Sequence, residues 1–254
     1  MSEWIGLLRS LIVYWRPGRQ PGLRRLYAPF VREGDLVFDV GAHLGDRSAA
    51  FAALGARVIA FEPQPRVARW LRRLVGHNPS IVVREEAVGA RSGIAHLAIS
   101  RRHPTVSTMS ESWRTNAEGA NPGFVGVRWE SSIQVPVVTL DALIESYGTP
   151  SFCKIDVEGY EAEVLVGLSQ PLAALSVEFV AGHLGVAVDC IRRLTQLGAY
   201  QFNVVAGEGR SFDFEAWRTA EEMLGWLEAG AGGCSSGDVY ARLELVNATA
   251  SPDA

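Results

Sequence analysis

Lysine is almost absent from this chain of 254 residues. Lys154 is the only lysine, so every other one of the 24 basic residues is an arginine. The 28 acidic residues outnumber the basic ones, and the formal net charge at pH 7 is -4. A negative net charge gives no overall attraction for nucleic acid, so we expect no nucleic-acid partner.

Cysteine and long apolar runs are also scarce. Cys153, Cys190 and Cys234 lie far apart and form no Cys-x-x-Cys pair, which argues against a disulfide framework or a zinc ribbon. No apolar run approaches the roughly 18 residues of a membrane span. Glu3 and Arg9 interrupt the apolar N-terminus, which therefore does not resemble a signal peptide. These absences predict a cytoplasmic protein.

What the chain does contain is a regular alternation of strand-like and helix-like segments. Its length suits one α/β domain with additions better than two domains. We expect strands at 36–40, 56–63, 80–86, 151–157, 172–180, 199–205 and 239–246, and helices at 46–54, 66–75, 141–147, 159–168, 188–197 and 214–228. This order predicts a mostly parallel sheet with helices on both faces. The last two strands are expected to form an antiparallel hairpin at the sheet edge.

The first 33 residues are expected to form a helical extension of the main domain, which we place at 34–246. Apolar side chains at helical spacing predict an amphipathic helix over 3–15. Six arginines lie in residues 1–32 against Glu3 alone, so this segment is basic. Such a helix can bind a membrane surface or a partner protein. It can also cover the sheet or a dimer interface, which is the explanation we favour.

Two further segments look irregular. Residues 101–130 are polar and rich in Gly, Asn, Ser and Pro, with Trp113, Phe124 and Trp129 scattered among them. Long irregular insertions of this kind are usually functional or disordered, so we interpret 101–130 as a substrate-binding lid. The tail 247–254 is expected to be disordered.

Acidic residues stand at the ends of successive predicted strands. Ligands of open α/β sheets bind outside the carboxyl ends of the strands, so a set of carboxylates in register there indicates a binding site. The five strand-end carboxylates are Asp39, Glu62, Glu86, Asp156 and Glu178.

The stretch "DVGAHLG" (39–45) predicts a tight glycine turn that opens into a helix. Gly41 lets a ligand approach the backbone, and Gly45 allows close packing at the helix start. The motif is not G-x-G-x-x-G, and Asp39 would repel a pyrophosphate. No Tyr-x-x-x-Lys pair is present either, so a nicotinamide-dependent oxidoreductase is the less favoured alternative. A cofactor with ammonium and ribose groups suits the site, because Glu62 can accept hydrogen bonds from both ribose hydroxyls. S-adenosylmethionine has this charge pattern.

Six blocks of sequence occur in an order that resembles one enzyme family, the FkbM family of S-adenosylmethionine-dependent methyltransferases. The blocks are "FDVGAHLGDRS", "AFEPQP", "EEAVGA", "VVTLDAL", "KIDVEGYEAEVLVGL" and "GDVYARL", between Leu36 and Leu243. The resemblance implies a class I methyltransferase fold, a three-layer sandwich whose seven-stranded sheet has an antiparallel last strand. It also implies O-methylation of a hydroxyl on a sugar, a glycan or a natural product. The expected cofactor-binding residues are Asp39, Gly41, Ala42, His43, Gly45, Glu62, Pro63, Glu86, Ala87 and Asp156.

Methyl transfer to an alcohol requires alignment and removal of the hydroxyl proton. In the implied fold, the strand that ends at Asp156 ends beside the methyl group. Asp156, Glu158 and His183 are all candidates for the base. The set Asp156, Glu158, Glu178 and His183 can also hold a divalent cation that lowers the pKa of the acceptor. The carboxylates are equally explained as partners of the sulfonium, of Lys154 and of the substrate, so the cation is the less favoured explanation.

The rest of the "KIDVEGYEAEVL" block is expected to have structural roles. Lys154 lies inside a strand, where a buried ammonium needs a carboxylate partner. Glu161 and Glu163 lie in the first turns of a predicted helix, where the helix dipole favours negative charge.

Overall fold

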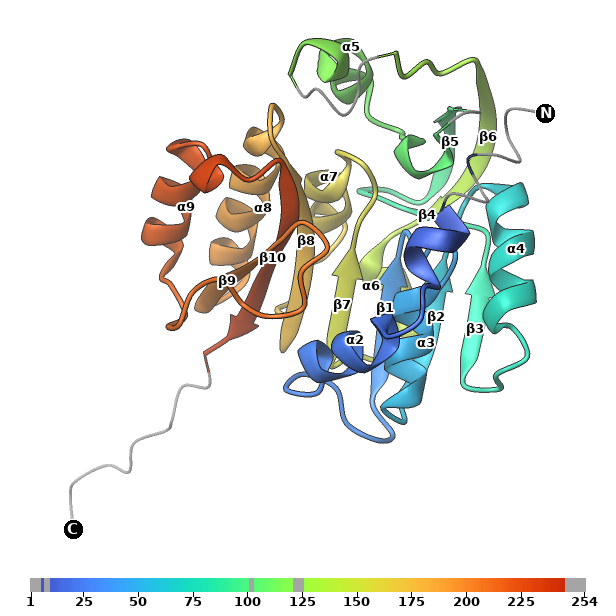
Figure 1. Cartoon of the computed structure of the whole chain (residues 1–254), viewed down its shortest axis with the longest axis horizontal. Helices are drawn as coiled ribbons and strands as arrows, with labels where there is room; N and C mark the ends of the chain where they lie inside the picture. The colour runs from blue at the N-terminus through green and yellow to red at the C-terminus, as the bar shows by residue number, and fades with distance from the viewer. Residues whose placement is uncertain (1–5, 7–9, 101–102, 121–125, 245–254) are drawn as a thin grey trace.

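The computed structural model describes residues 6, 10–100, 103–120 and 126–244. Its centre is a seven-stranded sheet in the order β3-β2-β1-β7-β8-β10-β9 (Figure 1). The strands are β1 (Leu36–Val40), β2 (Arg57–Phe61), β3 (Ile81–Arg84), β7 (Phe152–Ile155), β8 (Ala174–Val180), β9 (Tyr200–Ala206) and β10 (Ser236–Leu243). Strand β1 pairs in parallel with β2 and β7, and β10 runs antiparallel between β8 and β9. The predicted parallel sheet with an antiparallel last strand is confirmed.

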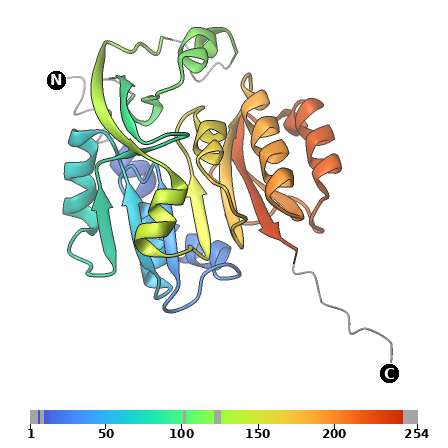
Figure 2. The ribbon, with the colours of Figure 1, turned by 180° about the vertical axis from the view of Figure 1, so that it is seen from behind.

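Helices cover both faces of this sheet because successive residues of each buried strand point to opposite sides. Val37 packs with the helices of one face and Phe38 with those of the other. The first group is α2 (Arg19–Tyr27), α3 (Asp46–Ala53) and α4 (Pro65–Val75). The second group, in front in Figure 2, is α6 (Leu140–Tyr147), α7 (Glu161–Val166), α8 (Leu184–Leu197) and α9 (Ala220–Glu228). The three predicted layers are therefore present.

The N-terminal region contributes directly to the core. The ring of Tyr27, at the end of α2, lies 4.4 Å from the ring of Phe51 and 5.5 Å from that of Phe152 between centroids. The indole Nε1 of Trp15 donates a hydrogen bond to the carbonyl of Leu44 at 3.1 Å. Of the predicted helix at 3–15, only Gly6 and the stretch from Ser10 on are described, and residues 10–14 are helical. Leu11 and Trp15 pack with Leu44 of the glycine turn and with Val67 on α4, so the described part of this region lies against the main domain.

A second, smaller sheet lies beyond the carboxyl ends of the parallel strands (Figures 1 and 2). Its strands, in the order β4-β6-β5, are β4 (Ala87–Val88), β5 (Gly93–Ile99) and β6 (Ser131–Val138). No strand was predicted at 93–99. Strand β5 exposes Ile94 while it buries Leu97 and Ala98, so its apolar pattern is weak.

The insertion 101–130 is more ordered than we expected. It contains a short 3-10 helix, η1 (Pro104–Val106), and the helix α5 (Glu111–Ala120). The Ser110 hydroxyl accepts a hydrogen bond from the backbone N–H of Trp113, which stabilises the start of α5. The buried Trp113 side chain anchors the helix. One aromatic residue therefore holds α5 in place, and the helix needs no apolar face with regular helical spacing. Phe124 lies outside the described residues.

The helix predicted at 214–228 is wrong in its first part. Thr219 and Glu222 form a capping box, and this box sets the start of α9 at Ala220. Residues 207–219 instead form a loop that carries Glu208 back to the N-terminal region. No helix within the described ranges is long and apolar enough to cross a membrane. The tail 247–254 lies outside the described residues.

Candidate active site

An open cavity lies at the carboxyl ends of β1, β2 and β7, with about 840 Å³ of empty space including its mouth. The loops that follow these strands form its floor, and Tyr14 and residues of the insertion line it as well. Of the predicted cofactor residues, nine line it: Asp39, Gly41, Ala42, His43, Glu62, Pro63, Glu86, Ala87 and Asp156. The cavity therefore lies where the strand-end carboxylates indicated a binding site.

The glycine turn after β1 is shaped by close packing. Gly41 has φ +82°, and a Cβ there would lie 1.7 Å from the carbonyl oxygen of Asp156. Gly45 has φ +79°, and a Cβ there would lie 2.4 Å from Cδ1 of Leu71 on α4. Any other residue would be strained at either position. Gly45 does not line the cavity, so its role is to let α3 start against α4.

Asp39 is fully buried beneath this turn. Its Oδ2 accepts a hydrogen bond from the Ser48 hydroxyl at 2.5 Å, whereas its Oδ1 has no partner among the described residues. Burial raises the pKa of Asp39, against the opposing effects of Lys154 and Ser48. A buried carboxylate oxygen without a donor is costly, so this atom is prepared to accept a hydrogen bond from a ligand.

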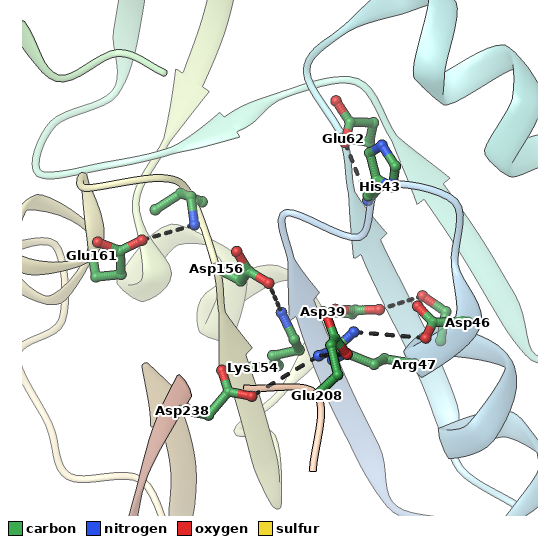
Figure 3. A network of polar contacts seen from close by, with 12 residues as sticks. Asp39, His43, Asp46, Arg47, Glu62, Lys154, Asp156, Glu161, Glu208 and Asp238 are labelled. Atoms are coloured by element: carbon green, nitrogen blue, oxygen red, sulfur yellow. Dashed lines mark hydrogen bonds and ion pairs between the residues drawn. The ribbon is translucent and has the colours of Figure 1, made fainter. Parts of the chain in front are cut away.

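Glu62, at the end of β2, is also buried, but backbone groups hold both of its oxygens. Its Oε2 accepts from the N–H of His43 at 3.1 Å (Figure 3). Its Oε1 accepts from the N–H of Gln64 at 2.9 Å. Burial raises the pKa of Glu62 to about 7 despite these two donors. The two backbone donors fix the orientation of the carboxylate, which lines the cavity as a hydrogen-bond acceptor.

His43 adopts a left-handed backbone with φ +48°, which presents its N–H to Glu62. Burial lowers the pKa of its imidazole to about 4, so the ring is neutral at pH 7. The ring of Tyr14 lies edge-on to it, with 5.5 Å between centroids. This arrangement fits a residue that shapes the cavity.

Glu86 lines the cavity beyond β3, but it already has a partner. Arg84 forms an ion pair with its carboxylate, with Nε 2.8 Å from Oε2, and also donates a hydrogen bond to the hydroxyl of Tyr147. Arg84 therefore holds the Glu86 carboxylate in a fixed position. We had not predicted this role, although the Arg-x-Glu spacing at the strand end is a signal for it.

Asp156 and Glu158 line one end of the cavity, and Glu178 lies beside them without lining it. One carboxylate oxygen of each lies within 4.8 Å of the others, which could hold a metal ion. The Lys154 ammonium donates to Asp156 Oδ2 at 2.6 Å, so the predicted buried ion pair is confirmed. Burial favours the neutral form of Asp156, but Lys154 and Arg47 outweigh it and hold its pKa below the ordinary value.

Glu158 and Glu178 behave in the opposite way. Burial raises the pKa of each well above its ordinary value, and the negative charge of Asp156 raises it further. Their mutual repulsion favours the protonated form of Glu158 and Glu178 and the ionised form of Asp156. Asp156 is the ionised member because only it contacts Lys154.

The loop that carries Glu158 is held from two sides. Glu158 has a left-handed backbone with φ +56°, and its carbonyl accepts a hydrogen bond from the Thr108 hydroxyl at 2.7 Å. A Cβ on Gly159 would lie 2.2 Å from Cε3 of Trp113 on the insertion. From the other side, Glu161 Oε1 accepts from the N–H groups of Val157 and Gly159. Glu161 therefore has the structural role that we predicted, through the loop rather than the helix dipole alone.

His183 does not line the cavity. It lies at the start of α8, and its ring packs against Trp113 with 4.4 Å between centroids. Burial lowers the pKa of His183, so its ring is neutral at pH 7. It is not a member of the carboxylate group either, so the structure brings together three of the four metal-ligand candidates.

Several cavity residues were missed by the sequence argument. Thr105, Ser107 and Met109 of the insertion line the cavity, and the Ser107 hydroxyl donates to Gln64 Oε1 at 3.0 Å. Arg47 lines it from the second position of α3. In the sequence, Arg47 lies two residues after the glycine motif and inside a predicted helix, and nothing else marks it as a cavity residue.

The sheet order, the antiparallel β10 and the glycine turn beneath acidic strand ends define the class I methyltransferase architecture. Residues 39–231 match the Methyltransferase FkbM domain. The chain therefore belongs to the FkbM methyltransferase family, and the resemblance noted in the sequence is confirmed.

Two curated relatives are each 30% identical to this chain. One is the hexuronic acid methyltransferase AglP of Haloferax volcanii, matched over 172 residues, 67% of this chain and 65% of AglP. The other is the 31-O-demethyl-FK506 methyltransferase FkbM of Streptomyces tacrolimicus, matched over 211 residues, 72% of this chain and 78% of the relative. The match thus spans slightly less than two thirds of the length of AglP.

Among solved structures, the chain is similar to the precorrin-6y C5,15-methyltransferase of Geobacter metallireducens. The sequence identity is 12% and the TM-score is 0.45, with 89% of this chain and 87% of that chain covered.

Proposed function

We propose that this protein is an S-adenosylmethionine-dependent O-methyltransferase that acts on a hydroxyl of a sugar, a glycan or a natural product. Membership of the FkbM family supports the reaction class. The observation that carries the proposal is Asp39, whose buried Oδ1 has no donor among the described residues. A cationic amino group supplies that donor, and the α-ammonium of S-adenosylmethionine is such a group.

The other cavity residues fit the same cofactor. The Glu62 carboxylate, oriented by two backbone N–H groups, would accept the two ribose hydroxyls. Glu86, held by Arg84, lies at the next strand end and would bind on the adenine side. When bound, S-adenosylmethionine supplies a methyl group on a sulfonium, which is activated for transfer. The remaining work of the protein is to align the acceptor and remove its proton.

We assign the proton acceptor to Asp156. It lines the cavity, and Lys154 keeps it ionised, so it can accept a hydrogen bond from an acceptor hydroxyl and then its proton. Glu158 also lines the cavity, and its raised pKa favours the protonated form, which can donate a hydrogen bond. It would therefore orient the acceptor oxygen. His183 would act through Trp113, by supporting the insertion that borders the cavity.

The acceptor class follows from the relatives. One is named for a hexuronic acid and the other for 31-O-demethyl-FK506, so both names describe hydroxyl-bearing small molecules or sugars. The insertion residues that line the cavity would form the acceptor side, in agreement with a lid.

Calorimetric titration of the purified protein with S-adenosylmethionine tests the proposal. We expect binding by the wild type and a loss of at least about tenfold in affinity for Asp39→Asn, since one charge-assisted hydrogen bond is lost. Asp189→Asn is the matched control, because Asp189 is exposed on α8. No binding by the folded wild-type protein would contradict the proposed function.

A further inference from the structure

Arg47 and Lys154 are the two Lys or Arg side chains that line the cavity within the described residues. Lys154 is already committed, because its ammonium is buried and lies 2.6 Å from Asp156 Oδ2. The other charged residues that line the cavity are carboxylates: Asp39, Asp46, Glu62, Glu86, Asp156 and Glu158. A ligand anion that enters this cavity therefore has one cation to bind, Arg47.

The guanidinium of Arg47 is surrounded by carboxylates but bonded tightly to none of them. It lies 3.6 Å from Asp46 Oδ2, 3.5 Å from Glu208 Oε2 and 4.0 Å from Asp238 Oδ2. Its Nε is buried and has no hydrogen-bond partner in the described part of the chain. These distances are long for charge-assisted hydrogen bonds, which are usually about 2.7–2.9 Å.

Arg19 explains why these carboxylates leave Arg47 loosely held. Its guanidinium lies 2.6 Å from Asp46 Oδ2 and 2.6 Å from Glu208 Oε2, on the same oxygens that Arg47 approaches. The two best partners of Arg47 are thus already satisfied. Figure 3 shows Arg47 between Asp46 and Glu208, beside Asp39. Arg47 is fixed in place by their charge and keeps donors for another acceptor.

We propose that Arg47 binds the α-carboxylate of the cofactor's methionine moiety while Asp39 binds its α-ammonium. The inference rests on the proposed function. An α-amino acid carries both charges a few bonds apart, and the cavity places one carboxylate and one guanidinium beside each other at the glycine turn. Arginine suits this role, because its planar fork can donate two parallel hydrogen bonds to a carboxylate. In the absence of Arg47, the acidic cavity would repel that carboxylate.

The consequence is a specific selectivity. Decarboxylated S-adenosylmethionine keeps the nucleoside, the sulfonium and the amine but lacks the carboxylate, so it isolates the proposed contact. We expect calorimetry to show that wild-type protein binds S-adenosylmethionine at least about tenfold more tightly than this analogue. In Arg47→Gln the two ligands should bind with similar affinity, and Arg47→Lys should restore part of the difference. Arg192→Gln, which removes an exposed arginine with similarly long ion pairs on α8, is the matched control.

The outcomes separate the two proposals. If Arg47→Gln still prefers S-adenosylmethionine as strongly as the wild type does, Arg47 does not bind the carboxylate. If Arg47→Gln loses affinity for both ligands equally, its role is structural and the inference is wrong. Retention of the wild-type affinity for the decarboxylated analogue shows that the variant cavity is folded. If the wild type binds neither ligand, it is the proposed function that fails.

Discussion

The ammonium of Lys154 lies 2.6 Å from the Asp156 carboxylate at the carboxyl end of β7, and only 1% of the lysine side chain is exposed. The single lysine of the chain thus neutralises the carboxylate that we assign as the proton acceptor. Because Lys154 holds the pKa of Asp156 below its ordinary value of 3.8, Asp156 binds fewer protons in the folded state than in the unfolded state. Its contribution to stability is present above pH 3.8 and is lost as the pH falls through the folded pKa.

Replacing Lys154 should change both activity and stability. In Lys154→Met the Asp156 carboxylate loses its counter-charge, so its pKa should rise and the acidic limb of the pH–rate profile should move to higher pH. Breaking a buried ion pair costs about 3–5 kcal/mol of unfolding free energy. Urea denaturation of Lys154→Met and of the double variant Lys154→Met/Asp156→Asn checks this value. The double variant should recover part of the loss, and an unshifted pH–rate limb would contradict the role of Lys154.

The two carboxyl groups of the 156–158 loop should respond differently to amide replacement. Asp156→Asn removes an ionised proton acceptor, so turnover should fall by at least about a hundredfold, while S-adenosylmethionine binding is retained. Glu158→Gln replaces a carboxyl whose raised pKa favours the protonated form with a neutral donor of the same shape, so its effect should be smaller. A search for products heavier by 14 Da, in extracts incubated with wild type or Asp156→Asn, measures turnover without a known acceptor. Equal product from both would remove Asp156 from the mechanism.

Chelation should leave methyl transfer intact. Asp156, Glu158 and Glu178 lie close enough to hold a cation, but Lys154 and proton sharing already account for their charges. Turnover in excess EDTA should therefore equal turnover without it. A loss in EDTA that added Mg²⁺ restores would show instead that the three carboxylates hold a metal.

Gly159 should control the position of the insertion. A methyl group there would collide with the Trp113 ring, and the backbone has φ +85°. Gly159→Ala should lower the unfolding free energy by about 1–3 kcal/mol and raise the KM for the acceptor more than the KM for the cofactor. Gly225→Ala on α9, where nothing lies within 4 Å of a new Cβ, is the matched control. Unchanged stability and KM values in Gly159→Ala would contradict this packing role.

Local sequence patterns were sufficient to predict the main sheet. The apolar run of β1, the glycine turn after it and the acidic strand ends are features of single segments, and each lies where we expected it. The same patterns placed Asp39, Glu62 and Asp156 together, because parallel strands bring their carboxyl ends to one edge.

Contacts between distant segments could not be predicted in this way. Strand β5 exists because it pairs with β6 almost forty residues later in the chain, and α5 is anchored by Trp113 against His183. The position of Arg47 between Asp46 and Glu208 depends on a loop 161 residues away. His183 was misplaced for the same reason: its nearness to Asp156 was inferred from adjacent strand ends, but the start of α8 turns it toward the insertion.

Gly41 packs against the carbonyl of Asp156, so the backbone of the glycine turn and that of the loop after β7 lie in direct contact. A Cβ at position 41 would lie 1.7 Å from that oxygen, so the glycine turn also sets the position of Asp156, which we assign as the proton acceptor. A substitution there would shift the donor and acceptor sides together. Thr108 and Trp113 tie the insertion to the 158–159 loop, so a change at either residue would also move the floor of the cavity.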